Sequence, residues 1–305
     1  MNIGIIGAGA IGLVSAYYLN KNHHVTLYVR SENQLQAILE NGIHYIYKQE
    51  LKGEKVTVKL FNEWKGEEDL TVIAVKQYQL VAVLEKIEEQ TNKIGTTLFL
   101  QNGMSHIHML KESSLRDILI GIVEHGAIKE NEHTVIHSGI GSIKLAVLKG
   151  SCKDTLTQLT DKQLSSFQMF HEPNYFTIMQ KKLFVNSIIN TLTSILKVRN
   201  GQLVENEHYI SLMNLFMEEI FQVLALNDEE KVVYKQYCIQ LIHQTKRNKS
   251  SMLRDLEEFR KTEIDAILGY IIDEAEKKKV AIPITTSYYY MIKGQEQMMV
   301  RSEHI

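Results

Sequence analysis

The sequence predicts an α/β fold: an N-terminal Rossmann-type, doubly wound, mostly parallel sheet, followed by an all-helical C-terminal domain. Three observations support this prediction. The first half alternates β-rich runs with helix-like segments, which is typical of a parallel sheet covered by helices on both faces. A glycine-rich turn, GAGAIG at 7–12, follows the first strand-like run. From about residue 174 the apolar residues recur three and four apart, which is the spacing of helices.

Five short runs in the first half are expected to form the strands of the sheet: 2–6, 24–29, 70–75, 96–100 and 118–123. Each is nearly continuous in apolar residues, as parallel strands buried on both faces are. Helix-like segments lie between them, at 11–21, 31–41, 77–91 and 104–112. Two more strand-like runs within 134–148 flank Gly139 and Gly141, so we expect a hairpin at the edge of the same sheet.

The second half contains five segments with helical spacing: 174–198, 205–226, 228–246, 263–279 and 284–297. Within 205–226 one apolar stripe is expected to face the core: Leu212, Leu215, Phe216, Ile220, Val223 and Leu224. A chain of 305 residues suggests about two domains. Pro173 suits the start of a helix and not its interior, so we expect the division there, giving domains of 1–172 and 173–305.

Charge and cysteine content exclude several classes of protein. Lys and Arg number 34 and Asp and Glu number 36, so the formal net charge is −2 and a broad surface for nucleic acid is not indicated. Cys152 and Cys238 form neither a zinc pattern nor a disulfide framework, and a reducing cytoplasm is the expected compartment. We expect no membrane span and no signal peptide, because apolar runs are short and the first strand begins at residue 2.

The glycine-rich turn predicts dinucleotide binding. Gly7 permits a tight turn, Gly9 lets the backbone approach a pyrophosphate, and Gly12 lets the following helix pack closely on the strand. The pyrophosphate would lie at the positive end of that helix, which we expect to be amphipathic. The expected contacts are Gly7, Ala8, Gly9, Ala10, Ile11 and Gly12. A purely structural turn is the alternative, and the strand–turn–helix context favours dinucleotide binding over it.

Arg30 ends the second strand-like run and predicts a preference for NADP. It stands eighteen residues after Gly12, where NAD-binding proteins usually hold an Asp or Glu for the ribose 2′-hydroxyl. A guanidinium can bind the 2′-phosphate of NADP with paired charge-assisted hydrogen bonds, whereas an acidic group would repel it. Glu32 follows closely and weakens this inference, and a solvated surface arginine is the alternative.

Polar residues also follow the next three strands, at the edge of the sheet where ligands of open α/β folds bind. Lys76 is expected to meet phosphate or ribose oxygens, and Asn102 to bind ribose or substrate. The role of His125 stays open, because each of these residues could also be an ordinary turn residue.

His106 and His108 lack the spacing of a zinc motif, so we expect them at the surface or in satisfied polar positions, and we expect no metal site.

The helical half carries a polar stripe within an otherwise apolar segment. Lys182, Asn186 and Asn190 recur at i, i+4 and i+8, so they share one face of a helix. Buried polar groups are costly unless they find partners, so a wall for a polar substrate is the functional interpretation. A solvated stripe on an amphipathic helix is the alternative.

A second polar segment precedes a short helical run and offers three small polar side chains: Asn248, Ser250 and Ser251. Beyond it, Thr262 is expected to cap a helix, with Asp265 three residues later as a capping-box partner. Glu263 would then lie in the first turn. It either faces a substrate or only stabilises the positive end of the helix.

The chain resembles the ketopantoate reductase family, also called 2-dehydropantoate 2-reductases, over essentially its whole length. The matching segments are GAGAIG (7–12), VKQYQ (75–79), QNGM (101–104), EHG (124–126), KLFVNSIINTLTS (182–194), NGQL (200–203) and NKSSMLRD…TEIDAI…G (248–269). The combination is specific, although each segment alone is not. The sequence departs from the family pattern at Thr191, at Glu258-Phe259 and at 277–279, none of which is assigned a role here.

The resemblance implies NADPH-dependent reduction of 2-dehydropantoate to (R)-pantoate, on the route to pantothenate and coenzyme A. Lys182 resembles the general acid that protonates the new alkoxide, and Glu263 the carboxylate that contacts the substrate's hydroxyl. The groups that resemble the family's substrate-positioning residues are Asn102, Asn186, Asn190 and Ser251, with Asn248 nearby. The implied cofactor contacts include Gly7, Gly9, Gly12, Arg30 and Lys76.

Two other functions stay open. One is another NADP-dependent 2-oxoacid reductase on the same scaffold, because a fold does not determine a substrate. The other is a non-catalytic NADPH-binding regulator, which would have no need for Lys182 and Glu263 together. The expected partner is a small 2-oxoacid, with neither nucleic acid nor membrane, and the helical half could also form a homodimer.

Overall fold

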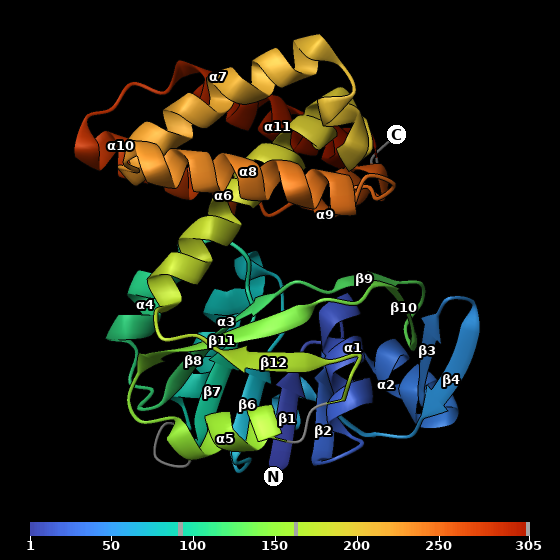
Figure 1. The fold of residues 1–305 in the computed structure, drawn as a ribbon. Coiled ribbons are helices and arrows are strands. Elements are labelled where there is room, and N and C mark those ends of the chain that lie inside the picture. The colour runs from blue at the N-terminus through green and yellow to red at the C-terminus, as the bar shows by residue number, and fades with distance from the viewer. Residues whose placement is uncertain (91–93, 162–163, 303–305) are drawn as a thin grey trace. The chain divides into compact units, whose positions relative to one another are not determined.

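The structure, a computed structural model, describes residues 1–90, 94–161 and 164–302. They form two compact units (Figure 1). The first, here called the sheet unit, comprises Met1–Gln101 and Ile107–Ile178, and the second, the helical unit, comprises Asn102–His106 and the chain from Met179 onward. The expected fold class is confirmed. The domain bounds 1–172 and 173–305 stay a prediction.

The sheet unit is built on an eight-stranded sheet in the order β12-β11-β8-β7-β6-β1-β2-β5. Six neighbouring strands pair in parallel: β8 (Ile118–Val123), β7 (Thr96–Phe99), β6 (Leu70–Ile73), β1 (Asn2–Ile6), β2 (His24–Val29) and β5 (Thr57–Leu60). The five strands that the apolar runs predict are all present. β11 (Ser142–Lys149) runs antiparallel to β8 and parallel to β12 (Gln168–His171).

A second, four-stranded sheet has the order β4-β3-β10-β9, with β3 (Ile43–Tyr47), β4 (Glu50–Glu54), β9 (Gly126–Lys129) and β10 (Thr134–Gly139). The expected hairpin at 134–148 is therefore wrong. β10 pairs with β9 and β3, whereas β11 belongs to the main sheet. Gly141 lies at this crossing, where a Cβ would come 2.4 Å from the carbonyl oxygen of Glu124. The glycine thus serves close packing between chain segments and not a hairpin turn.

The first helix, α1 (Ala10–Leu19), contacts strands of both sheets, among them β2 and β10. Every residue from Gly12 to Leu19 is buried, so the expectation of an amphipathic helix is wrong. The second sheet covers the side of α1 that would otherwise face water. The remaining helices of the sheet unit are α2 (Glu32–Asn41), α3 (Leu80–Glu88), α4 (Ile107–Glu112) and α5 (Lys153–Asp161), with 3₁₀ turns at Phe61–Glu63 and Gln77–Gln79.

The helical unit contains α7 (Glu207–Leu224), α8 (Asp228–Gln244), α9 (Ser251–Glu257), α10 (Tyr270–Lys278) and α11 (Pro283–Ser302). It also contains most of α6 (Tyr175–Leu196), a 3₁₀ turn at Asn200–Val204 and a π-helical turn at Asp265–Gly269 that leads into α10. The N-terminus of α6 is capped locally, because Asn174 Oδ1 accepts from the backbone N–H groups of Phe176 and Thr177 at 2.9 and 3.3 Å.

The inner face of α7 differs from the expected stripe. Phe216, Ile220 and Val223 are buried as expected, but Leu212 and Leu215 are exposed. Met213, Met217 and Phe221 are buried instead. α10 and α11 both contact α7, so its buried face is set by these two helices and is rotated from the one that the apolar pattern favoured.

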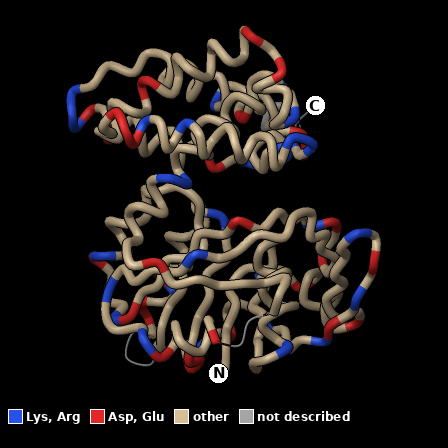
Figure 2. The backbone as a smooth tube through the Cα atoms, in the orientation of Figure 1, with Lys and Arg blue, Asp and Glu red and all other residues tan. Residues whose placement is uncertain are grey.

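Charges are distributed over both units. Lys and Arg lie interspersed with Asp and Glu along the two parts of the chain (Figure 2). Within the described residues, none of the helices combines the length and the apolar character that crossing a membrane would require.

Candidate functional site

The glycine-rich turn connects β1 to α1 and leaves open space at its centre. Gly7 has φ +104°, a conformation that L side chains rarely adopt, and its N–H donates to the carbonyl of Tyr28 at 3.0 Å. A Cβ on Gly12 would lie 1.8 Å from the Gly7 carbonyl oxygen, so both glycines are required by the fold. A Cβ on Gly9 would meet nothing within 4 Å. No packing contact requires glycine there, whereas the approach of a ligand to the backbone would.

The turn after β6 lies against the glycine-rich turn. A Cβ on Gly7 would come 2.8 Å from Val75 Cγ1 and 3.0 Å from the Val75 backbone nitrogen. Lys76 follows immediately and is partly exposed. Arg30 is exposed at the end of β2, the strand that receives the Gly7 N–H. The structure therefore brings the glycines, Lys76 and the end of β2 to one edge of the main sheet.

In the helical unit, the segment after β7 contacts the start of the helical stretch that leads into α10. Asn102 Nδ2 donates to Glu263 Oε2 at 3.0 Å. Gly103 has φ +79°, and a Cβ there would lie 2.2 Å from the Ala266 carbonyl oxygen. Glu263 is buried, with 7% of its surface exposed. Two segments far apart in sequence thus place an amide and a carboxylate together.

Thr262 holds the start of this helical stretch. Its Oγ1 accepts from the N–H of Ile264 at 3.2 Å, so the expected N-cap is present. The expected capping box is wrong, because the Thr262 N–H and Oγ1 both donate to Glu296 Oε1 on α11, at 2.8 and 2.7 Å. Asp265 instead accepts from Tyr289 Oη at 2.8 Å. The carboxylate that accepts from Thr262 is therefore that of Glu296 on α11 and not that of Asp265 nearby in the sequence. This contact fixes the backbone next to Glu263.

The polar stripe of α6 is buried at its two asparagines. Asn186 and Asn190 are 7% and 8% exposed, and their amides make no hydrogen bond to another described residue. A solvated stripe is therefore the wrong interpretation for these two. Lys182 is partly exposed on the same face. Lys181 points elsewhere, with its Nζ over the Tyr237 ring, 4.1 Å from the centroid.

The two adjacent serines at the start of α9 differ in burial and in their hydrogen bonds. Ser250 is buried, and its Oγ accepts from the Leu253 N–H at 3.1 Å and from Thr193 Oγ1 on α6 at 2.8 Å. Ser251, the first residue of α9, is exposed, and its hydroxyl makes no hydrogen bond to a described residue. Asn248 is partly exposed, and its carbonyl accepts from the Asn200 N–H at 3.0 Å.

Asn200 is a buried polar residue to which the sequence analysis assigned no role. It is 7% exposed, its Nδ2 donates to Thr245 Oγ1 at 2.9 Å, and its Oδ1 has no partner among the described residues. The NGQL motif at 200–203 was the available signal. The motif alone did not show that the backbone N–H of Asn200 donates to Asn248, in the segment before α9.

Comparison with known proteins covers both units. Residues 3–150 match the family described as Ketopantoate reductase PanE/ApbA, and residues 174–296 match Ketopantoate reductase PanE/ApbA C terminal. The chain belongs to the ketopantoate reductase family. A relative from Bacillus subtilis (strain 168), named 2-dehydropantoate 2-reductase, is 38% identical over 302 residues, which cover 97% of this chain and 98% of the relative.

Solved structures extend the likeness to the fold of this ketopantoate reductase family member. A probable 2-dehydropantoate 2-reductase from Bacillus subtilis has a TM-score of 0.85 at 37% identity, covering 97% of this chain and 100% of that one. The ternary structure of D-mandelate dehydrogenase with NADH and anilino(oxo)acetate has a TM-score of 0.88 at 25% identity, covering 98% and 99%.

His106 of this ketopantoate reductase family member is neither at the surface nor satisfied, contrary to expectation. It is 0% exposed, and neither ring nitrogen has a hydrogen-bond partner among the described residues. Burial lowers its pKa to about 4, and the negative charge of Glu263 opposes this shift. His108 is exposed and lies 3.1 Å from Glu112. The described residues contain no group of three His, Cys, Asp or Glu side chains that could hold a metal ion.

His125 ends a buried chain of hydrogen bonds in the sheet unit. Its Nδ1 accepts from the Gly141 N–H at 3.1 Å, so the ring proton must sit on Nε2, which is buried without a partner among the described residues. His137 Nε2 therefore donates to His125 Nδ1 at 3.1 Å, and His137 Nδ1 accepts from Tyr45 Oη at 2.8 Å. Tyr45 in turn accepts from Tyr18 Oη at 2.6 Å. This network ties α1 to the second sheet.

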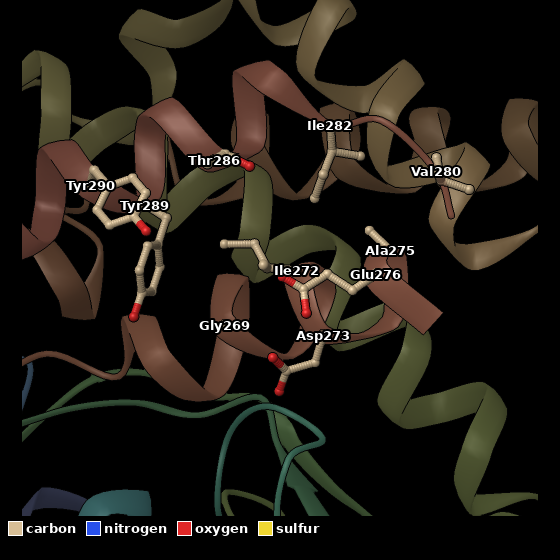
Figure 3. A pocket seen from close by; sticks show the side chains of 10 residues that line it. All are labelled: Gly269, Ile272, Asp273, Ala275, Glu276, Val280, Ile282, Thr286, Tyr289 and Tyr290. Carbon is tan, nitrogen blue, oxygen red and sulfur yellow. The ribbon is translucent and has the colours of Figure 1, made fainter. Parts of the chain in front are cut away.

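The helical unit also has a cavity of about 350 Å³ between α10 and α11 (Figure 3). Polar side chains lining it include Asp273, Glu276 and Tyr289. It is lined by none of the residues to which the sequence assigned a catalytic, substrate-binding or cofactor-binding role, Asn102 and Glu263 included.

Proposed function

We propose that this chain reduces 2-dehydropantoate to (R)-pantoate with NADPH, on the route to pantothenate and coenzyme A. The observation that carries the proposal is the buried Glu263 carboxylate held by Asn102 at 3.0 Å, in the same unit as Lys182 and the two buried asparagines of α6. Family membership along both units supports it.

The residues of the glycine-rich turn fit a dinucleotide. The open space at Gly9 and the backbone N–H groups at the start of α1 suit a pyrophosphate, and the contacts would come from residues 7–12 together with Lys76. Arg30 is exposed directly after β2, where NAD-binding proteins usually hold an acidic residue, and it would bind the 2′-phosphate of NADPH. NADPH supplies the hydride that adds to the keto carbon of the substrate.

Lys182 would manage the charge and proton of the reaction. Hydride addition turns the keto oxygen into an alkoxide, so negative charge grows on that oxygen. The Lys182 ammonium would stabilise this charge and then donate a proton from Nζ to the oxygen, which completes the alcohol. Lys182 is partly exposed, so it can regain a proton from water.

The substrate would be positioned by the buried polar groups of the helical unit. Glu263 would accept a hydrogen bond from the substrate's hydroxyl, and Asn102 would hold Glu263 in place while contacting the substrate. Asn186 and Asn190 would donate to its carbonyl and carboxylate oxygens, which would satisfy amides that otherwise lack protein partners. Ser251, with Asn248 nearby, would complete the set.

The test is steady-state kinetics of the purified protein with NADPH and a panel of 2-oxoacids. We expect 2-dehydropantoate to give the highest kcat/KM. A higher kcat/KM for another 2-oxoacid would identify that acid as the substrate in place of 2-dehydropantoate. Tight NADPH binding without turnover of any oxoacid would favour a non-catalytic regulator.

A second candidate follows from the likeness to D-mandelate dehydrogenase. Reduction of an aryl 2-oxoacid with NADH uses the same hydride and proton chemistry. The panel therefore includes the 2-oxoacid that corresponds to mandelate, with each of the two cofactors. A preference for that acid with NADH would decide for this candidate.

Two further parts of the proposal concern assembly and compartment. We expect a homodimer formed through the helical unit, where Leu212 and Leu215 of α7 are exposed. Light scattering of the wild type and of Leu215→Arg tests this, and a monomeric wild type would contradict it. The expected compartment is the cytoplasm, and both cysteines are free and buried.

A further inference from the structure

Gln34 of α2 bridges two backbone carbonyls in the sheet unit. Its Nε2 donates to the carbonyl oxygen of Ala8 in the glycine-rich turn at 2.9 Å and to the carbonyl oxygen of Glu132 at 2.9 Å. The side chain is buried, with 8% exposed. Both hydrogens of one amide are thus committed to backbone groups, one of which lies inside the expected cofactor site.

Local hydrogen bonds fix both the start of α2, which carries Gln34, and the turn that contains Glu132. Ser31 Oγ accepts from the Gln34 N–H at 3.3 Å and caps α2, which fixes where the side chain starts. Glu132 lies in the turn between β9 and β10, where Asn131 Oδ1 accepts from the N–H groups of His133 and Thr134 at 3.1 and 2.9 Å. Gln34 therefore links the glycine-rich turn to the start of α2 and to the turn between β9 and β10, both of which are fixed by local hydrogen bonds.

The contact at Ala8 determines where the next N–H points. In a planar trans peptide the C=O and the N–H of the following residue point in opposite directions. When Gln34 holds the Ala8 carbonyl, the Gly9 N–H must point away from Gln34. Glycine offers little resistance to rotation of this peptide, so the orientation needs an external constraint. The region around Gly9 is open, since a Cβ there would meet nothing within 4 Å.

We propose that Gln34 is a positioning residue for the dinucleotide, which holds the Ala8–Gly9 peptide so that the Gly9 N–H is directed at the pyrophosphate. Without it the peptide can rotate and present the Ala8 carbonyl oxygen, which repels phosphate oxygens. The inference rests on the proposed function only in requiring a dinucleotide cofactor. It requires no particular oxoacid.

The test compares Gln34→Met, which keeps the length of the side chain but cannot donate, with Gln36→Met on the exposed side of the same helix. Dissociation constants are measured for NADPH, for NADH and for adenosine 2′-monophosphate, which lacks the pyrophosphate. We expect Gln34→Met to weaken both dinucleotides by about 5- to 30-fold, as loss of a buried hydrogen bond in a site does, and to leave the fragment within about twofold. Gln36→Met should match the wild type.

Two results would overturn the inference: unchanged binding of both dinucleotides, or an equal loss for the fragment, which would indicate a general loss of structure. If Gln34→Met does not fold, Gln34→Glu takes its place. Its carboxylate faces the two carbonyl oxygens, and it should weaken the dinucleotides at least as much with the same sparing of the fragment. A wild type that binds neither dinucleotide would instead refute the proposed function.

Discussion

Asn102 and Glu263 are hydrogen-bonded at 3.0 Å although 161 positions separate them in the sequence. Asn102 follows β7 of the main sheet, yet it belongs to the helical unit together with Glu263. The sequence left it open whether Asn102 binds ribose or substrate. Its contact with a buried carboxylate favours the substrate.

This contact predicts that Asn102→Ala impairs substrate binding through Glu263. Without the amide, the carboxylate loses a charge-assisted hydrogen bond and its orientation. We expect KM for the oxoacid to rise by about 10- to 100-fold, as loss of a hydrogen bond to a charged group does, while the NADPH dissociation constant changes little. Glu263→Gln should give a similar rise in KM and a smaller fall in kcat. An unchanged KM in both variants would remove Glu263 from the substrate site.

Lys182→Ala tests the proton donor. We expect kcat to fall by about 10²- to 10⁴-fold, the usual contribution of a positioned general acid, with little change in NADPH affinity. Lys181→Ala is the matched control, because Lys181 lies over the Tyr237 ring instead. It should keep the wild-type kcat. Full activity of Lys182→Ala would exclude the proposed proton transfer.

Arg30→Asp tests the choice of cofactor. Arg30 is exposed at the end of β2, and it would pair with the 2′-phosphate that only NADPH carries. The variant should raise KM for NADPH by about 10- to 100-fold and leave KM for NADH nearly unchanged. A wild type that uses both cofactors equally well would show that Arg30 does not select between them.

Ser250→Ala and Ser251→Ala form a matched pair. Ser250 caps α9 and accepts from Thr193, so its loss should lower the free energy of unfolding by about 1–2 kcal/mol and leave KM near the wild-type value. Ser251 is exposed, so its loss should raise KM for the oxoacid without lowering stability. Urea unfolding and kinetics on both variants measure the two effects. The reverse assignment of effects would contradict the proposed role of Ser251.

The buried histidines predict a loss of stability in acid. Burial lowers the pKa of His125 to about 4, with the nearby His137 adding to the shift and Glu124 opposing it, and burial lowers the pKa of His106 to about 4. In the unfolded chain these groups bind protons below about pH 6.5, whereas in the folded state they do not until about pH 4. The contribution of these two histidines to stability should therefore be constant above about pH 7 and be lost as the pH drops from about 6.5 towards 4.

Urea unfolding at several pH values across this range checks the prediction. Protonated His125 could not accept from the Gly141 N–H, so His125→Gln should flatten the dependence. His108→Gln is the control, because His108 is exposed, and it should keep the wild-type slope. A dependence that is identical in the wild type and His125→Gln would show that another group causes it.

The sequence by itself determined the parts of this protein that depend on near neighbours in the chain. Alternating apolar runs predicted the five parallel strands, and helical spacing predicted α6 to α8 and α11, because periodicity reports which residues one element can bury. The positive φ of Gly7 and the collision that a Cβ at Gly12 would cause are local steric needs, which is why GAGAIG was readable.

Only the tertiary structure decided the features whose partners lie far away in the sequence. The run at 134–148 looked like one hairpin, yet its two strands found partners in different sheets. Thr262 was expected to pair with Asp265, but Glu296 on α11 took that position. No sequence pattern indicated a role for Gln34, because its side chain donates to the carbonyls of Ala8 and Glu132, which lie in turns far apart in the sequence. A polar side chain's partner depends on which segments the fold brings within hydrogen-bonding distance, and sequence spacing does not contain that information.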